Sequence, residues 1–288
     1  MTRLFTTNLL LLAALAFPPI SLAQPLLMLR GDPAPGALLI GQTEPGAKVW
    51  LDDQALRVNQ QGYFLFGFGR DAEGEQLLRV EAEQGQRERL ITLQPRQWNI
   101  QRVEGVPART VTPPEEQLKR IRAEAALVRA ARQTDSDLAE FADQFVWPAS
   151  GRISGVYGSQ RFYNGSPGSP HLGVDIAAPT GSPVIAPAGG VVTLVHEDMF
   201  YSGGTLLIDH GMGLSSTFIH LSKVLVKPGQ RVVQGQRIAE IGATGRATGP
   251  HLDWRLNWYQ ERLDPQWFMG GAKATHVEAG TPMAAPAK

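Results

Sequence analysis

Histidine and aspartate occur at close spacing in two stretches of the second half of the chain. The stretch HLGVD places His171 four residues before Asp175, and PHLD places His251 two residues before Asp253. The chain has no cysteine, so a metal ion here would be bound by imidazole nitrogen and carboxylate oxygen, a ligand set that suits zinc. These residues are therefore candidates for a zinc site.

Local geometry decides whether these pairs can share one ion. On a straight strand, His171 and Asp175 would lie roughly 13 Å apart, which is too far. We therefore expect a bend at Leu172 and Gly173 to fold His171 back over Asp175. His251 and Asp253 would lie roughly 7 Å apart along one face of a strand and can point into one pocket without distortion.

The segment TGPHLDWRLNW, residues 248–258, alternates strictly between polar and apolar side chains, which is the period of a half-buried strand. Its polar face consists of His251, Asp253, Arg255 and Asn257, and its apolar face consists of Leu252, Trp254, Leu256 and Trp258. The apolar face belongs in a core, so the polar face is left to line a site.

The surrounding sequence resembles the LytM/lysostaphin-type zinc endopeptidases, the M23 metallopeptidase family. The resemblance runs through HLGVDIAAPTGSPVIAPAGGVV and GGTLLIDHGMGLSSTFIHLSKVLVKPGQRVVQGQRIAEIGATGRATGPHLDW and covers residues 147–265. It implies an antiparallel β-sheet groove that holds one zinc ion (Zn²⁺) and cuts peptide cross-links of bacterial peptidoglycan. It also implies that His171 and Asp175 are zinc ligands, and that His220 and His251 are catalytic histidines that orient water and stabilise the oxyanion.

The chain departs from the family pattern at the third ligand. The usual motif on the last strand is HxH, whereas this chain has HxD, with Asp253 in the ligand position. Carboxylate oxygen binds zinc at about the same distance as imidazole nitrogen, so we expect Asp253 to be the third ligand. The alternative is that Asp253 anchors Arg255 or a water molecule. Two aspartates neutralise a divalent ion, so we expect an alkaline-shifted pH optimum or a lower turnover than in an HxH enzyme.

Two other polar residues lie in or near the matching segments. Asn164, in the loop before His171, is a candidate inhibitory or substrate-side ligand, and the alternative is a loop turn formed by Asn164 and Gly165. His210 is expected to be a structural histidine at a strand end.

The predicted function is an exported zinc-dependent endopeptidase that hydrolyses peptide cross-links of peptidoglycan, with the D-alanyl–diaminopimelate bond as the natural target in a Gram-negative-like periplasm. Its expected partners are peptidoglycan stem peptides. The alternative is a catalytically weak or inactive relative that binds cell wall or activates a separate amidase, a cell-wall enzyme partner. Lysine plus arginine and aspartate plus glutamate balance at 27 each, so nothing indicates a nucleic-acid partner.

A mainly β fold is expected to position these residues. Short β-like runs alternate with turn signals over residues 24–107, which predicts a small antiparallel β-sandwich. The expected strands are residues 37–40, 48–51, 63–68, 77–82, 89–93 and 98–103. Glycine- and proline-rich β-structure over residues 147–270 forms the predicted peptidase domain, with the LytM/lysostaphin-type sheet groove.

Residues 108–146 are predicted to be a short helical linker. Thr112 to Glu115 provide an N-cap and a capping box, and a second short helix is expected farther along. The apolar positions of the two helices are Leu118, Ile121, Ala125 and Val128 in the first, and Leu138, Phe141 and Phe145 in the second.

The two ends of the chain are expected to lie outside these domains. Residues 1–23 contain a short apolar run after Arg3 and small residues before Gln24, which is typical of a signal peptide cleaved after Ala23. We therefore expect a periplasmic or secreted protein with no stable membrane anchor after cleavage. The tail, residues 271–288, is rich in alanine, glycine and proline and is predicted to be disordered.

Overall fold

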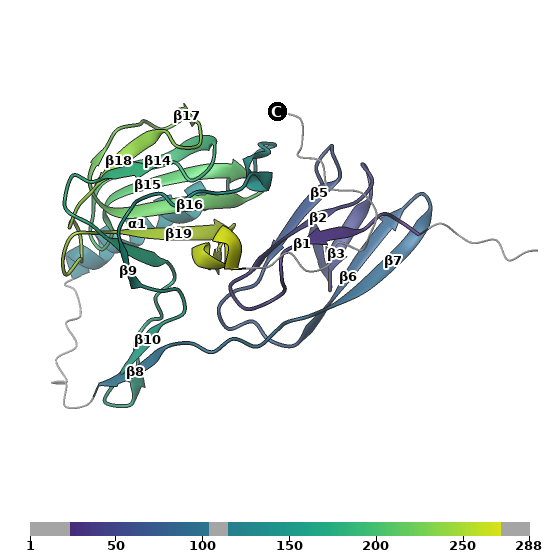
Figure 1. The fold of residues 1–288 in the computed structure, drawn as a ribbon, viewed down its shortest axis with the longest axis horizontal. Helices are drawn as coiled ribbons and strands as arrows, with labels where there is room; N and C mark the ends of the chain where they lie inside the picture. The colour runs from purple at the N-terminus through teal and green to yellow at the C-terminus, as the bar shows by residue number, and fades with distance from the viewer. Residues whose placement is uncertain (1–23, 104–114, 272–288) are drawn as a thin grey trace, which may run out of the picture.

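The computed structural model describes residues 24–103 and 115–271 (Figure 1). The predicted signal peptide, the N-cap of the linker helix and the tail from residue 272 lie outside the described residues. No helix in these two ranges is long and apolar enough to cross a bilayer.

Seven short strands of the N-terminal module form two antiparallel sheets, with the orders β1-β2-β5 and β4-β3-β6-β7. Their bounds are β1 Met28–Arg30, β2 Leu38–Gln42, β3 Lys48–Leu51, β4 Gln54–Leu56, β5 Tyr63–Gly67, β6 Glu75–Ala82 and β7 Gly85–Thr92. The predicted small sandwich is confirmed. The three-residue strands β1 and β4 were not predicted, because so short a segment carries almost no alternation.

The last strand predicted for the sandwich lies elsewhere. β8 (Ile100–Val103) runs parallel to β10 (Gln160–Tyr163), which also pairs with β11 (Ser166–Pro167). The chain before β8 is anchored to the C-terminal module, since Arg96 Nη2 lies 2.8 Å from Asp264 Oδ2. Trp98 also packs edge-on against Tyr157, with ring centroids 5.6 Å apart. These contacts lead β8 away from the sandwich.

The C-terminal module is built on a ten-stranded antiparallel sheet with the main order β17-β14-β15-β16-β19-β12-β9 (Figure 1). β18 pairs with β13 and β16, and β20 pairs with β19. The bounds are β9 Arg152–Gly155, β12 Val174–Ala177, β13 Pro183–Ile185, β14 Gly190–Met199, β15 Gly203–Gly211, β16 Leu214–Val224, β17 Arg231–Val232, β18 Arg237–Ile241, β19 His251–Trp258 and β20 Glu261–Leu263. One face of the sheet buries Phe218 and Trp254 completely, and the opposite face carries the candidate site.

Helix α1 (Glu115–Arg132) packs against β14 (Figure 1). Glu124 Oε2 accepts a hydrogen bond from the backbone N–H of Phe200, at 2.8 Å, just after β14. The second predicted helix is only a single 3₁₀ turn, η1 (Glu140–Ala142), and a short π-helical turn, η2 (Trp267–Gly271), follows β20. The linker helix therefore lies on the C-terminal module.

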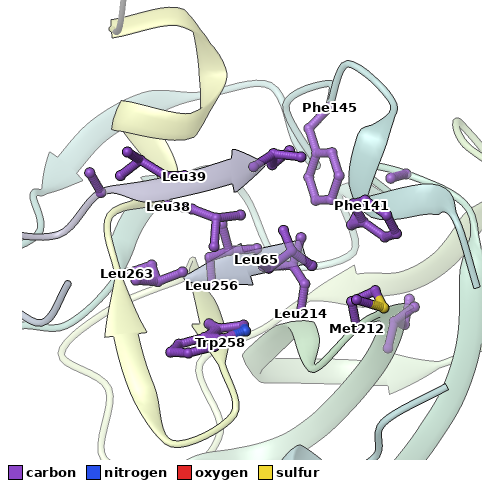
Figure 2. Close-up of a cluster of buried hydrophobic side chains, with 14 of the residues drawn as sticks. Leu38, Leu39, Leu65, Phe141, Phe145, Met212, Leu214, Leu256, Trp258 and Leu263 are labelled. Carbon is purple, nitrogen blue, oxygen red and sulfur yellow. The ribbon is translucent and has the colours of Figure 1, made fainter. Parts of the chain in front are cut away.

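One continuous hydrophobic core joins the two modules. Figure 2 shows Leu38, Leu39 and Leu65 of the sandwich beside Leu256, Trp258 and Leu263 of β19 and β20. Leu39 is 1% and Leu65 2% exposed, and burying a leucine side chain contributes about 1.5–3 kcal/mol. The sandwich therefore helps to fix β19, the strand that carries His251 and Asp253.

Candidate metal centre and its groove

The two aspartates of the predicted site lie directly opposite each other on neighbouring strands. β12 pairs antiparallel with β19, and the register places Asp175 beside Asp253 and Ala177 beside His251. Side chains at directly opposed positions have Cβ atoms about 4.5–5.5 Å apart on the same face. Strand register alone therefore brings both carboxylates to one place.

His171 joins them because the chain bends before β12, as predicted. Its Nε2 atom lies 3.2 Å from Asp175 Oδ1. The bend passes close to β19 at Gly173, where a Cβ atom would lie 2.5 Å from Asp253 Oδ1 and 2.9 Å from the carbonyl oxygen of Trp254. Only glycine fits there, so Gly173 is needed for the approach of the His171 loop to Asp253.

The three side chains fit a divalent metal ion. One ligand atom from each of His171, Asp175 and Asp253 lies within 4.8 Å of the others. His171 Nε2 and Asp175 Oδ1 are buried and form no hydrogen bond. Neighbouring ligand atoms of a tetrahedral zinc ion are roughly 3.3 Å apart, and the His171–Asp175 pair already has this separation. Imidazole nitrogen and carboxylate oxygen are both ligands that zinc accepts.

Asp253 has a second partner in Arg255. Arg255 Nη2 lies 2.6 Å from Asp253 Oδ2, and Arg255 Nε donates to Asp253 Oδ1 at 3.0 Å. Burial alone would raise the pKa of Asp253, but the charge and hydrogen bonds of Arg255 outweigh it and hold this pKa below its usual value. Asp253 is therefore an anion held by arginine, so both of the roles expected for it, metal ligand and anchor of Arg255, are open to it.

The two histidines predicted to be catalytic lie together beside these carboxylates. The ring centroids of His220 and His251 are 4.7 Å apart. His220 Nδ1 donates to the carbonyl oxygen of Thr244 and His251 Nδ1 to that of Gly249, both at 2.8 Å. A carbonyl oxygen can only accept, so each neutral ring keeps its proton on Nδ1 and leaves Nε2 as an acceptor. His251 Nε2 lies 3.8 Å from Asp175 Oδ1.

His220 has an unusual backbone conformation for a strand residue. Its φ is +65°, in the left-handed region that non-glycine residues rarely adopt. The pairing of β16 with β18 shifts register just after it, between Leu221 and Lys223. Such irregularities re-aim side chains and gather at functional sites. Here the irregularity accompanies the side chain that packs on His251.

The remaining candidate residues lie elsewhere. Asn164 (φ +49°) and Gly165 (φ +78°) form the two-residue loop between β10 and β11, and such a left-handed pair is typical of a tight hairpin turn. Asn164 is exposed there, so the turn expected as the alternative is present. His210 is fully buried, with Nδ1 2.7 Å from the carbonyl oxygen of Gly189 and Nε2 2.9 Å from Ser216 Oγ. Its predicted structural role is confirmed.

Sequence reasoning considered Arg255 as a partner of Asp253 but missed Arg132 and Arg262 beside the site. Arg132, on α1, is 6% exposed and lies in a cavity with Arg255 and Arg262. A signal was present, since Arg132 follows Val128 by four residues and so continues the predicted apolar stripe of the helix. A charged residue on that stripe indicates one of two things. Either the aliphatic part of its side chain covers apolar surface while the charge reaches solvent, or the charged group has a function.

The C-terminal half of the chain is similar to known peptidases. Residues 169–265 match the model of Peptidase family M23. Peptidoglycan DD-endopeptidase ShyA of Vibrio cholerae is 47% identical over 88 residues, which are 31% of this chain and 20% of ShyA. DD-carboxypeptidase/endopeptidase Mpg of Neisseria meningitidis is 40% identical over 95 residues, 33% of this chain and 22% of Mpg. The chain thus spans about a fifth of the length of these curated relatives.

A solved structure extends the likeness beyond the matched segment. The crystal structure of a candidate M23 peptidase of Pseudomonas aeruginosa aligns with a TM-score of 0.64 at 31% identity. The alignment covers 83% of this chain and 96% of that one. The family model matches only residues 169–265, so this structural likeness also includes much of the chain outside those residues.

Proposed function

Because this chain belongs to the M23 peptidase family, we propose that it is an exported zinc-dependent endopeptidase that hydrolyses peptide cross-links of peptidoglycan. The observation that carries the proposal is the convergence of His171, Asp175 and Asp253 within 4.8 Å, next to the paired rings of His220 and His251. ShyA is named a peptidoglycan DD-endopeptidase, and Mpg is named a DD-carboxypeptidase/endopeptidase. Both names support this substrate class. We propose the periplasm as its location.

In the proposed site, His171, Asp175 and Asp253 hold the ion. A zinc ion supplies Lewis-acid chemistry, because it polarises a carbonyl and lowers the pKa of water. The rigid β12–β19 register keeps the two aspartates in place without a flexible loop between them. Preorganised ligands of this kind lower the cost of assembling the site.

His220 and His251 handle protons and negative charge. Burial lowers the pKa of His220, so its ring is neutral near pH 7 and its free Nε2 can accept a proton. The Nε2 atom of His251 lies beside Asp175, 3.8 Å from its Oδ1 atom. One ring can act as the base while the other, once protonated, stabilises the oxyanion of the tetrahedral intermediate.

A second function is favoured by the ion pair between Asp253 and Arg255. Arg255 contacts both carboxylate oxygens of Asp253, so it competes with any metal for this ligand. If Arg255 keeps Asp253 from binding the metal, the chain would retain the groove and bind stem peptides without cutting them. It would then act as a wall-binding protein or as an activator of a separate amidase.

Zinc content separates the two functions. The full chain from Gln24 is purified without chelator and analysed for zinc, beside Asp253→Ala and the exposed control Asp71→Ala. The enzyme proposal expects about one zinc per chain, loss of zinc in Asp253→Ala only, and release of peptides from cross-linked peptidoglycan. If the protein stays free of zinc after incubation with excess metal but still binds peptidoglycan sacculi, the enzyme proposal is rejected and the wall-binding function is supported.

A further inference from the structure

A cavity of about 420 Å³ lies between α1 and the polar face of the main sheet. Arg129 and Arg132 line it from the helix, and Thr217, Arg255 and Arg262 line it from β16, β19 and β20. The cavity adjoins the candidate metal centre, because Thr217 pairs across strands with Arg255. Arg255 in turn holds Asp253.

Two buried polar groups of this cavity have no partner. Arg132 is 6% exposed, and its Nε atom is buried without a hydrogen bond. Thr217 is 2% exposed, and its Oγ1 atom is likewise buried and unsatisfied. An unpaired buried donor typically costs about 1–3 kcal/mol, and more for a charged group. Both groups are therefore available to donate a hydrogen bond to a molecule in the cavity.

The nearby carboxylates are already engaged. Asp253 is held by Arg255. Glu124, which also lines the cavity, accepts from Arg120 Nε at 2.6 Å and from the Phe200 N–H. Within the described ranges, neither Arg132 nor Arg262 forms an ion pair with a carboxylate. The cavity therefore has an excess of positive charge.

The burial of this positive charge lowers the pKa of both arginines. Burial, followed by the charges of Arg262 and Arg255, lowers the pKa of Arg132 to about 8. Burial, followed by the charge of Arg255, lowers the pKa of Arg262 to about 10. A buried charge is tolerated when an opposite charge pairs with it, so an anion in the cavity would relieve both arginines.

We propose that this cavity binds a free carboxylate of the peptide substrate, with Arg132 and Arg262 as its partners. Guanidinium groups bind carboxylates through paired, charge-assisted hydrogen bonds, and Thr217 Oγ1 can donate one more. The inference rests on the proposed function, since the cavity lies next to the proposed metal centre. It makes α1 part of the substrate site.

The chemistry of the cross-link supplies such a group. When the side-chain amine of diaminopimelate is acylated, the carbon that bears this nitrogen also carries a free carboxylate. A carboxylate next to the scissile amide is therefore a feature that a groove with a cationic pocket can recognise. Amides formed by simple side-chain amines, such as that of lysine, lack it.

The test compares two peptides on the zinc-loaded full chain. The first is L-alanyl-γ-D-glutamyl-diaminopimelate acetylated on its side-chain amine, with its carboxylates free, and the second is the same acetylated peptide with the carboxylate beside that amine converted to an amide. Calorimetry is expected to give at least about tenfold tighter binding of the free form. Arg132→Met is expected to reduce this preference to less than about twofold, with zinc content unchanged. Arg122→Met, an exposed arginine on the same helix, is expected to keep it.

Other results would overturn the inference. Equal affinity for the two peptides, or an undiminished preference in Arg132→Met, would show that the cavity does not bind this carboxylate. Inorganic sulfate is titrated in parallel; if it binds as tightly as the free peptide and is lost in Arg132→Met, the pocket is an inorganic-anion site. Arg132→Met is expected to fold, because it removes an unpaired buried charge, and Arg132→Gln serves as a second variant. If the chain prefers the free carboxylate but does not hydrolyse cross-linked peptidoglycan, the proposed peptidase function is refuted and this inference is retained.

Discussion

Asp253 and Arg255, two residues apart on the same face of β19, form an ion pair in which Asp253 is buried and Arg255 partly exposed, with Arg255 Nη2 2.6 Å from Asp253 Oδ2. The pair changes the charge expected for the site. Two aspartates would neutralise a divalent ion, but Arg255 returns one positive charge beside the second aspartate. The net charge of Asp175, Asp253 and Arg255 is −1, as for a site with one carboxylate and two histidines. The alkaline shift expected from HxD is therefore largely offset by Arg255.

Replacing Arg255 with methionine is expected to raise the affinity for zinc at least about tenfold. The substitution removes a competitor for Asp253 and a positive charge close to the ion. In the metal-free protein it leaves Asp253 buried and unpaired, which costs about 3–5 kcal/mol. Chelator competition measures the affinity, and thermal unfolding is expected to give a lower Tm without zinc and a larger gain on adding it. The exposed Arg237→Met is the control, and unchanged zinc affinity in Arg255→Met would contradict the competition.

The same variant is expected to shift the pH–rate profile. Without Arg255, two aspartates act on the site uncompensated, so the acidic limb of the profile for peptidoglycan hydrolysis moves to higher pH. Arg237→Met again provides the comparison. A profile that does not move when zinc is fully bound would mean that Arg255 does not balance the charge of Asp253.

His220→Ala is expected to lower turnover about a hundredfold or more while the zinc content stays at the wild-type value. The ring is positioned by the carbonyl of Thr244 and packs on His251, and general acid–base groups contribute about 10²–10⁴ in rate. Hydrolysis of cross-linked peptidoglycan and elemental analysis are measured on the same sample. Half-exposed His196→Ala serves as the control. Loss of zinc along with activity would make His220 a metal ligand and overturn its assigned role.

Much of the site follows from local sequence. The alternation of residues 248–258 predicts which side chains of β19 share a face, and Gly173 permits the bend that brings His171 to Asp175. The choice between the two roles of Asp253 could not be made, since neighbours on one strand face can pair with each other or with an ion. The position of Arg132 beside the site depends on how α1 packs on the C-terminal module. The position of β8 depends in the same way on the chain after the sandwich. That is a long-range property, and no local pattern specifies it.

His210 is expected to make stability depend on pH between 6.5 and 4. Its complete burial lowers the pKa from 6.5 to about 4 in the folded chain. Below pH 6.5 the unfolded chain therefore takes up a proton that the folded chain does not. The contribution is fully present above pH 6.5 and falls by on the order of 3 kcal/mol as the pH drops to about 4.

The matched variant for this prediction is His210→Asn, which cannot titrate in this range. Urea unfolding at several pH values is expected to show that the stability advantage of the wild type over this variant shrinks steadily from pH 6.5 to 4. Other ionisable groups are common to both chains and cancel in the difference. Parallel stability curves for the two proteins would refute the buried, neutral state of His210.

The ion pair between Arg96 and Asp264 is expected to be a main polar link between the modules. Arg96 also donates to the carbonyl oxygen of Pro35 at 2.8 Å and stacks over Trp98 and Trp267, while the Asp264 side chain is only 4% exposed. Arg96→Met leaves this carboxylate buried without its partner, so it is expected to cost about 3–5 kcal/mol of unfolding free energy. In an Asp264→Asn background no charge is left unpaired, and the same substitution is expected to cost only about 1 kcal/mol. The four proteins of this double-mutant cycle are compared by urea unfolding. An equal cost of Arg96→Met in both backgrounds would assign its effect to packing on the tryptophans rather than to the ion pair.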